Sequence, residues 1–468
     1  MLFTSFDFAF FLPIVFLLYW IFYKNIKVQN VIIVLASYVF YGWWDWRFLS
    51  LIFISSLVDF LVGRELAKVE SKKGRKGLLL ISLTVNIGFL AFFKYFNFFL
   101  DNFYSIFTFF GQSFNGQLFN IVLPVGISFY TFQTLSYTID IYRNKLRPTK
   151  DPIAFFAFVS FFPQLVAGPI ERASNLLPQF ASKRFIDDKT FSYGFKLMVW
   201  GFFLKLVVAD RAAIYVNAVY NNVESHDGLT FIMATVLFAF QIYGDFAGYS
   251  LIAIGTAKLF GFDLMTNFKR PYFARSVSEF WGRWHISLST WFRDYVYIPL
   301  GGNRTSKQRW LYNLFITFVI SGLWHGANWT FIIWGALNGA YLILEVLFNK
   351  KRRSGIHNVL LTFILICFSW VFFRSNTVGD SFLIVKDIFT NPGDLYIGIG
   401  DDITAPIYAV LGITLLLLFE VRREYFTNLL SAFWNRYQLV RMTGYSIIIF
   451  LILYLGVFNE SQFIYFQF

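Results

Sequence analysis

The chain has 468 residues, of which 57% are hydrophobic and 14% charged, and its mean hydropathy is +0.57. Soluble domains contain about 25% charged residues, so this composition excludes a soluble globular protein and indicates a polytopic membrane protein. The net charge of +13 lies in short loops between apolar runs. That distribution is typical of the positive-inside pattern of membrane proteins, not of a nucleic-acid-binding surface.

The first apolar run begins at the start of the chain, with MLFTSFDFAFFLPIVFLLYW. A secretory signal peptide has a basic region before its apolar core and a small-residue cleavage site after it. This run has neither, and its first basic residue, Lys24, follows it. We therefore expect a retained first helix whose N-terminus lies on the outer side of the membrane.

A series of apolar runs along the chain predicts about eleven to thirteen membrane segments. The runs are 6–23, 30–44, 48–63, 78–100, 118–141, 152–167, 191–222, 229–262, 310–348, 357–373, 405–421 and 443–459. No other stretch is long enough to bury a core of its own. We predict an all-α polytopic fold and one membrane domain over 1–468. Within it we expect N-terminal helices over 1–167, a core over 191–348, and C-terminal helices with a docked tail over 357–468.

Basic residues concentrate in every second loop of the first half of the chain. These loops are 24–27, 64–76 and 143–150. The positive-inside rule places them in the cytoplasm, together with 350–353 and 422–441. The acidic loop 375–404 is then expected outside, and the C-terminus at or near the outer face.

The run 310–348 contains no Lys or Arg and carries His325 near its middle. As one straight helix it would be about 58 Å long, nearly twice the ~30 Å hydrocarbon core. We therefore expect it to break, at Ser321-Gly322 and at Gly326–Asn328. A break at membrane depth is tolerated only where it faces protein or water.

An imidazole at such a break is suited to take a proton from a hydroxyl or thiol. Trp324 and Trp329 are candidates for apolar walls with an N–H donor each. Asn328 is a candidate to orient the ring or to polarise a carbonyl group. The alternative is that His325 is hydrogen bonded to a neighbouring helix as a purely structural residue.

The stretch FWGRWHISLSTWFRDYVYIPLGG, residues 280–302, is too polar to span a membrane and too aromatic for an ordinary loop. It favours an interfacial or re-entrant helix. On one helix, His285 and Ser289 would share a face because they are four residues apart. The alternative is an aromatic belt with snorkelling arginines, among them Arg283.

Asp245 lies inside the apolar run 229–262 and needs a cationic partner there. We look for that partner among the arginines of 270–293 and favour an ion pair over a catalytic acid. Cys367 is the only cysteine, so no disulfide framework is available. Two histidines with few nearby acids do not predict a metal site, and we expect no metal.

Several long motifs, in one order along the chain, resemble the membrane-bound O-acyltransferase family. The branch is the bacterial one typified by the alginate O-acetyltransferase membrane subunit, with the teichoic-acid D-alanylation membrane protein as a more distant relative. The motifs are PVGISFYTFQTLSYTIDIYR (124–143), FFPQLVAGPIER (161–172), YGDFAGYSLIAIG (243–255), FWGRWHISLSTWFRDYVYIPLGGNR (280–304), SGLWHGANWTFIIWGALNG (321–339) and WVFFR (370–374).

The resemblance implies a basket of helices with a central tunnel and a catalytic core over 191–348. His325 matches the family's essential histidine, in its WHG motif, and His285 matches an earlier polar position. We take both as candidate catalytic residues, and Trp324, Asn328 and Arg283 as candidate substrate-binding residues.

The resemblance also implies the reaction. An acyl group, acetyl by analogy with the polysaccharide-acetylating branch, would come from acyl-CoA in the cytoplasm, with no permanently bound cofactor. It would leave on the other face with the help of a separate SGNH-hydrolase-like protein, periplasmic or extracellular. The final acceptor would be a hydroxyl of an exported or cell-wall polysaccharide, and the location a bacterial plasma (inner) membrane.

The chain ends in the apolar sequence FIYFQF, residues 463–468. A terminus frays unless it is tied down, and this one is too apolar for water, so we expect it to dock. Tyr465 would then lie near the acyl path and carry the acyl group transiently as a phenyl ester. The alternative is a docking anchor without chemistry.

Two other classes of function remain open at the level of the sequence. A transporter or flippase would move a polar substrate through the same cavity, although we see neither internal repeats nor paired broken helices. A non-catalytic scaffold of a polysaccharide export complex would not need His325 or His285.

Overall fold

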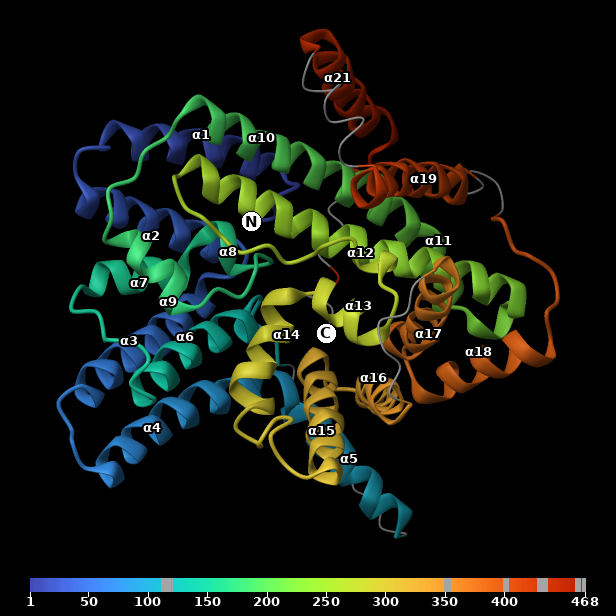
Figure 1. The fold of residues 1–468 in the computed structure, drawn as a ribbon, viewed down its shortest axis with the longest axis horizontal. Coiled ribbons are helices and arrows are strands. Elements are labelled where there is room, and N and C mark those ends of the chain that lie inside the picture. Colours follow the sequence, from blue (N-terminus) through green and yellow to red (C-terminus); the bar gives the residue numbers. More distant parts are fainter. Residues whose placement is uncertain are drawn as a thin grey trace. The chain divides into compact units, whose positions relative to one another are not determined.

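The computed structural model of this chain describes residues 1–110, 119, 121–348, 355–398, 404–426, 437–458 and 464. These residues form helices and connecting segments, and none of them is in a β-strand, which confirms the predicted all-α class (Figure 1). They form two compact units. Unit 1 consists of Met1–Phe195 and Ala253–Met265, and unit 2 of Lys196–Ile252 and Thr266–Phe468.

Unit 1 contains the helices of the N-terminal part of the chain. They are α1 (Phe6–Ile21), α2 (Ile26–Gly42), α3 (Leu49–Leu66), α4 (Lys72–Leu90), α5 (Phe96–Phe109), α6 (Ile127–Tyr142), α7 (Pro152–Ser160), α8 (Phe162–Leu165), α9 (Ala173–Leu176) and the start of α10 (Asp188–Phe202). Ser5, Asn25 and Ser71 cap α1, α2 and α4, because each side-chain oxygen accepts a backbone N–H of the first turn.

A buried polar cluster joins three helices of unit 1. The carboxylate of Asp59 on α3 accepts hydrogen bonds from Ser82 and Asn86 on α4, the latter at 2.8 Å. The Ser82 hydroxyl also lies 3.0 Å from that of Thr138 on α6. Buried polar groups that satisfy one another in this way hold membrane helices together.

Helix α6 begins later than the predicted run 118–141. Gly126, which precedes its first residue, has a left-handed backbone with φ of +73°, and a Cβ there would lie 3.0 Å from the carbonyl oxygen of Leu165. Glycine is therefore required at this bend. Residues 121–125, which precede it, contribute to the run without being helical.

Unit 2 contains the remaining helices, with α12 running from unit 2 into unit 1. They are α11 (Asp210–Tyr220), α12 (Gly228–Leu259), α13 (Val277–Arg283), α14 (Ile286–Phe292), α15 (Lys307–His325), α16 (Trp329–Leu347), α17 (Ile356–Arg374), α18 (Val378–Thr390), α19 (Thr404–Tyr425) and α21 (Gln438–Leu455). The π-helical turn η4 (Phe203–Ala209) joins α10 to α11.

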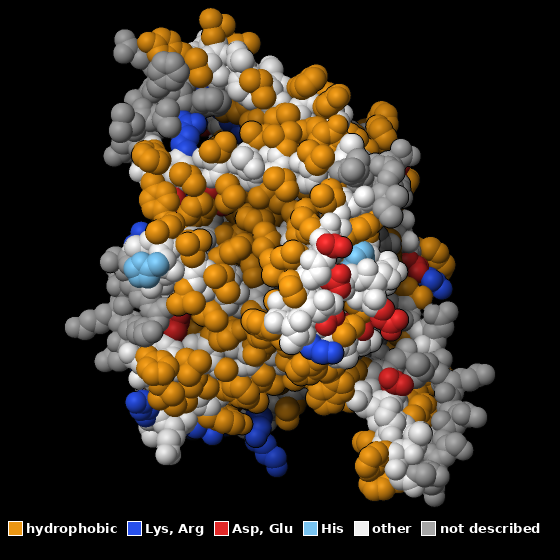
Figure 2. Space-filling view, turned by 90° about the vertical axis from the view of Figure 1, so that its right-hand side faces the viewer, with side chains coloured by type: hydrophobic (Ala, Val, Ile, Leu, Met, Phe, Trp, Pro, Cys, Tyr) orange, Lys and Arg blue, Asp and Glu red, His pale blue; other side chains and the backbone are white. Residues whose placement is uncertain are grey.

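Six helical segments of the described residues are long and apolar enough to cross a membrane. They are Trp46–Leu66, Lys72–Phe109, Gly228–Leu259, Trp329–Leu347, Ile356–Arg374 and Gln438–Leu455. Large apolar side chains such as Phe10, Ile364 and Leu453 are exposed, and Figure 2 shows one face on which hydrophobic side chains predominate. Such surfaces are suited to lipid. The chain is a multi-pass membrane protein. The expected number of crossings, eleven to thirteen, stays a prediction.

Candidate active site

Helices α15 and α16 pack against each other as an antiparallel hairpin in unit 2. The predicted break at Gly326–Asn328 is confirmed, and the chain reverses its direction there. Each helix has 19 residues and is therefore about 28 Å long. The segment is thus two helices of nearly membrane length instead of one helix broken in its middle.

The second expected break, at Ser321-Gly322, is wrong because these residues lie inside α15. A Cβ on Gly322 would lie 2.2 Å from the carbonyl oxygen of Phe331, and a Cβ on Gly335 would lie 2.4 Å from that of Phe318. The two glycines therefore serve close approach between the helices, not a bend.

His325 is the last residue of α15 and is buried, with 3% of its surface exposed. Its ring centre lies 5.0 Å from those of Trp324 and Trp334 and 5.4 Å from that of Phe373 on α17. All three contacts are edge-to-face, the favourable geometry for aromatic pairs. The imidazole therefore lies in an aromatic enclosure at the turn of the hairpin.

His285 lies between α13 and α14 instead of within one re-entrant helix as expected. Its backbone is left-handed, with φ of +41°, a conformation that costs a residue other than glycine on the order of 1–3 kcal/mol. Helix α14 begins after it, so His285 and Ser289 do not share a helix face; the His285 carbonyl oxygen accepts the Ser289 N–H at 3.0 Å.

The His285 imidazole is buried against Phe246 and hydrogen bonded to Asn267. Its ring centre is 4.4 Å from that of Phe246, and its Nδ1 is 3.1 Å from the side-chain oxygen of Asn267. Burial lowers the pKa of His285 to about 3. The ring is therefore neutral at physiological pH, with one protonated nitrogen and one lone pair.

Trp324 brings the two candidate catalytic residues together. Its ring centre lies 6.5 Å from that of His285 and 5.0 Å from that of His325. The structure thus places His285 and His325, which are 40 positions apart in the sequence, in contact with one indole ring.

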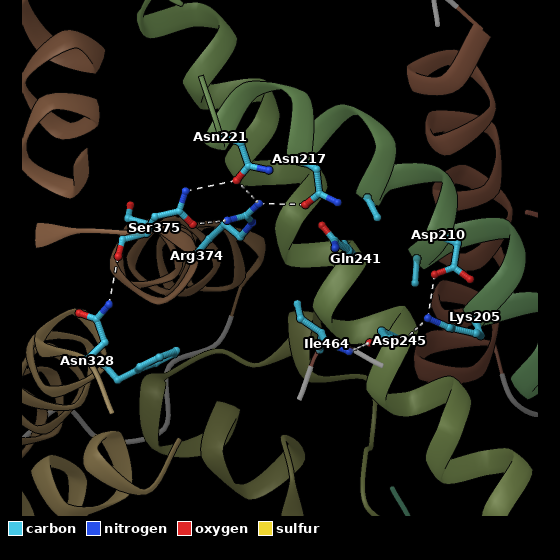
Figure 3. A pocket seen from close by; sticks show the side chains of 14 residues that line it. Lys205, Asp210, Asn217, Asn221, Gln241, Asp245, Asn328, Arg374, Ser375 and Ile464 are labelled. Atoms are coloured by element: carbon cyan, nitrogen blue, oxygen red, sulfur yellow. Dashed lines mark hydrogen bonds and ion pairs between the residues drawn. The ribbon is translucent and has the colours of Figure 1, made fainter. Parts of the chain in front are cut away.

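Asn328 lies just beyond the turn and caps α16. Its side-chain oxygen accepts the Thr330 N–H at 3.0 Å, and its amide nitrogen donates to the carbonyl oxygen of Asn376 at 3.0 Å. Both ends of the amide are therefore engaged away from the imidazoles. Asn328 lines a cavity of about 540 Å³, which we call the turn cavity (Figure 3).

The turn cavity is lined mainly by amide and charged side chains from α11, α12 and α17. Its polar residues include Asn217, Gln241 and Arg374, and the Arg374 guanidinium donates to Asn217 at 2.9 Å. Phe331 also lines it, and the rings of Phe331 and Phe373 lie 4.9 Å apart. Phe373 also packs against His325. The rings of Phe331 and Phe373 therefore lie between the turn cavity and that imidazole, and each is in contact with the next.

A buried ion cluster forms one side of the turn cavity (Figure 3). The Lys205 ammonium group lies 2.8 Å from an oxygen of Asp210 and 2.7 Å from one of Asp245. Asp245 forms the expected ion pair, but its partner is Lys205, and the prediction of an arginine from 270–293 is wrong. Lys205 reaches it because Gly248 on α12 permits close approach; a Cβ there would lie 3.0 Å from the Lys205 backbone nitrogen.

The chain end reaches the same cavity. The other carboxylate oxygen of Asp245 accepts the backbone N–H of Ile464 at 2.7 Å, and Ile464 lines the turn cavity. Its neighbour Tyr465, the candidate acyl carrier, lies outside the described residues.

Arg283 lies in a different place from the other candidate residues. Its guanidinium pairs with Glu279 at 2.6 Å and with Glu424 at 2.9 Å. It lines a second cavity, of about 740 Å³, between the start of α15, at Trp310, and the end of α16, at Glu345. We call this the open-end cavity, since it lies at the end of the hairpin opposite His325.

Sequence reasoning missed Lys205 and Asn267. The signal for Lys205 was present, as a lone cation in the apolar run GFFLKLVVAD that contains Asp210. Asn267 carries no such signal, because its contact with His285 depends on a turn that the sequence does not reveal. The described residues hold no group of three or more His, Cys, Asp or Glu that could bind a metal ion.

Known proteins of one family resemble this chain over most of its length. The model of the MBOAT, membrane-bound O-acyltransferase, family matches residues 77–377, which include both candidate histidines. The probable alginate O-acetylase AlgI of Pseudomonas syringae pv. tomato is 41% identical over 384 residues, covering 81% of this chain and 73% of that protein.

Two further relatives differ in the substrates that their names give. The peptidoglycan O-acetyltransferase of Helicobacter pylori is 34% identical over 411 residues, covering 80% of this chain and 77% of the relative. The teichoic acid D-alanyltransferase of Streptococcus thermophilus is 28% identical over 247 residues, covering 49% of this chain and 58% of the relative.

Proposed function

The chain belongs to the membrane-bound O-acyltransferase family, and from this premise we propose that it passes an acetyl group through the bacterial inner membrane for O-acetylation of an exported or cell-wall polysaccharide. The donor is acetyl-CoA, which binds from the cytoplasm as a substrate. The relatives named as O-acetyltransferases share more of this chain than the D-alanyltransferase does, which supports acetyl as the group transferred.

His325 acts as the general base. Its imidazole takes the proton of an acceptor hydroxyl while the hydroxyl oxygen attacks the thioester carbonyl carbon. A C–O ester bond forms, the C–S bond breaks, and the proton passes to the leaving sulfur to give free CoA thiol. The observation that carries this role is the buried position of His325 among three aromatic rings at the hairpin turn. Base catalysis of this kind contributes about 10²–10⁴-fold.

His285 and Trp324 complete the reaction centre. The Trp324 indole forms the wall between the two imidazoles and an apolar surface for the acyl group. His285, neutral and buried, presents a lone pair that accepts a hydrogen bond from the reacting group. Both roles are supported by the shared contacts with Trp324.

The two cavities suit a transfer between the two membrane faces. Trp310 in the open-end cavity and His325 at the turn are separated by fifteen positions of α15, about 22 Å along the helix. The basic sequence 350–353 follows α16, so the open end is the cytoplasmic end by the positive-inside rule. Arg283 then faces the donor side, and Asn328 the acceptor side.

The chain end delivers the acyl group to a partner. Ile464 is held by Asp245 at the turn cavity, which supports the proposal that this end of the chain acts on the acceptor side. The phenol of Tyr465 is the hydroxyl that takes the acetyl group from the thioester as an ester. A hydroxyl of an SGNH-hydrolase-like partner outside the membrane then forms a new ester with the acetyl group and gives its proton to the leaving phenolate. Tyr465→Phe keeps the anchor and removes the nucleophile, so polysaccharide acetylation is lost if Tyr465 is a carrier and retained if it only docks.

The experiment for the catalytic assignment is mass spectrometry of surface polysaccharide from cells that express this chain. We expect acetyl groups with the natural chain and none with His325→Ala at an equal membrane level. His226→Ala is the matched control, since His226 packs against Tyr396 and has no proposed role. Wild-type acetylation in His325→Ala would overturn the assignment and favour a transporter or scaffold.

A further inference from the structure

Asn267 lies beside His285 in the extended segment between α12 and the 3-10 helix η6 (Pro271–Phe273). Its backbone carbonyl oxygen accepts the N–H of Ile286 at 2.9 Å, and Lys269 N–H donates to the Arg283 carbonyl oxygen at 2.9 Å. These bonds bind the segment to the turn that carries His285. Asn267 therefore stays in place through its backbone, whatever its side chain is.

The side-chain oxygen of Asn267 receives three contacts. It lies 3.2 Å from the backbone nitrogen of Ser287, 2.9 Å from the Ser287 hydroxyl and 3.1 Å from Nδ1 of His285. The amide nitrogen of Asn267 lies 3.1 Å from the hydroxyl of Ser250 on α12. The whole side chain is buried.

The orientation of this amide follows from its contact with the backbone. Which end of an Asn amide is oxygen is normally assigned from its hydrogen bonds. A backbone N–H is a donor and never an acceptor, so the atom that faces the Ser287 nitrogen is the oxygen. An amide oxygen cannot donate, and the imidazole nitrogen that bonds to it must therefore carry the hydrogen.

We propose that Asn267 is a positioning residue that holds the proton of His285 on Nδ1 and leaves the lone pair on Nε2. In a neutral imidazole only one nitrogen is protonated, so fixing one fixes the other. The same contact braces the left-handed backbone at His285. The consequence for acetyl transfer rests on the role proposed above for His285; the tautomer itself does not.

Nitrogen NMR of the full chain labelled with ¹⁵N-histidine in micelles tests the tautomer directly. The chain has four histidines, so His285→Gln assigns the signal of interest by removing it. We expect a protonated Nδ1 and an unprotonated Nε2 in the natural chain. In Asn267→Leu we expect a shift towards the Nε2–H form, which free histidine prefers. The Ser287 hydroxyl also lies 3.4 Å from His285 Nδ1; Ser287→Ala removes this contact but keeps Asn267 and the backbone donor, so Nδ1 should stay protonated in that variant.

Acetyl transfer is measured on the same variants with radiolabelled acetyl-CoA. Hydrogen-bond partners that orient metal-bound histidines are typically worth about 10–100-fold. Asn267 has the same orienting role here, so we expect a loss of that size in kcat for Asn267→Leu, with the acetyl-CoA KM unchanged. Asn267→Asp retains the oxygen and should keep Nδ1 protonated. Asn313→Leu, a second buried Asn in unit 2 that bonds to the Gly302 carbonyl, controls for the loss of a buried amide.

The outcomes separate this inference from the proposed function. An Nε2–H signal in the natural chain, or an unchanged signal in Asn267→Leu, overturns the role of Asn267. The expected signals together with full transfer by His285→Gln support the role of Asn267 and overturn the proposed role of His285. A kcat loss in Asn267→Leu no larger than in Asn313→Leu overturns the consequence for transfer.

Discussion

Lys205 is held by two carboxylates in a part of unit 2 with almost no access to solvent. The side chains of Lys205, Asp210 and Asp245 are 5% exposed or less. Removing one partner of a buried ion pair leaves a charge without compensation, which costs about 3–5 kcal/mol. The same cluster also holds Ile464, so it ties the chain end to helix α12.

We therefore predict that Lys205→Met lowers the free energy of unfolding by about 3–5 kcal/mol. Lys68→Met is the matched control, because the pair of Lys68 with Glu65 is largely exposed and such pairs contribute about 0–1 kcal/mol. Denaturant titration of the purified proteins in micelles compares the two. Equal losses would show that the buried cluster is not a stabilising contact.

At the residue scale, the sequence indicated the candidate catalytic groups but not their neighbours. His325 and His285 stand out because an imidazole is rare in an apolar chain, which has four histidines. The contacts that orient them do not stand out, because Asn267 and Ser250 are ordinary residues until the fold brings them together. The pairing of Asp245 with Lys205 likewise depends on the close approach of α12 and η4 at Gly248. The cluster of arginines that the sequence suggested does not provide the partner.

At the scale of elements, the α15–α16 hairpin sets the position of His325. The two helices approach closely at Gly322 and Gly335, and the turn that follows His325 orients its ring towards α17. Small residues at a helix interface permit such an approach. Any side chain added there moves the aromatic enclosure as well as the helices.

We predict that Gly322→Ala destabilises the protein by about 1–3 kcal/mol, the usual cost of overpacking, and lowers acetyl transfer. Gly88→Ala on α4 is the matched control, because a Cβ at Gly88 meets nothing within 4 Å and alanine is the better helix former by about 0.5–1 kcal/mol. The melting temperatures in micelles should therefore move in opposite directions. A fall of the same size in both would contradict the role given to the hairpin contact.

The elements also show why a run of apolar residues is an incomplete guide. Length alone indicated a break in 310–348, and glycine content placed it at two sites, of which one is a turn and the other a packing contact. The stretch 280–302 was expected as a single helix. Its break at His285 depends on a left-handed residue, which no periodicity predicts.

At the scale of the whole molecule, the composition of the chain was sufficient to predict the class of protein. An apolar, helix-rich chain with basic loops predicts a polytopic membrane protein, and the described residues are helical with six membrane-length segments. The division into two units was not predicted, because no linker marks it in the sequence and α12 belongs to both.

Topology gives a prediction at the same scale. We expect Lys145→Cys to react with a membrane-impermeant maleimide only after the membrane is opened, and Asp394→Cys to react in intact spheroplasts. Both positions are exposed, and the native Cys367 is buried, so background labelling is low. The reverse pattern would contradict the assignment of basic loops to the cytoplasm.

The central claim is that His325 catalyses transfer of an acetyl group from one membrane face to the other. Proteoliposomes that enclose radiolabelled acetyl-CoA, with an SGNH-hydrolase-like partner and oligosaccharide outside, test it most directly. We predict label on the outer acceptor with the natural chain and with His226→Ala, and none above background with His325→Ala. Label transferred by His325→Ala at the rate of the natural chain would contradict the claim.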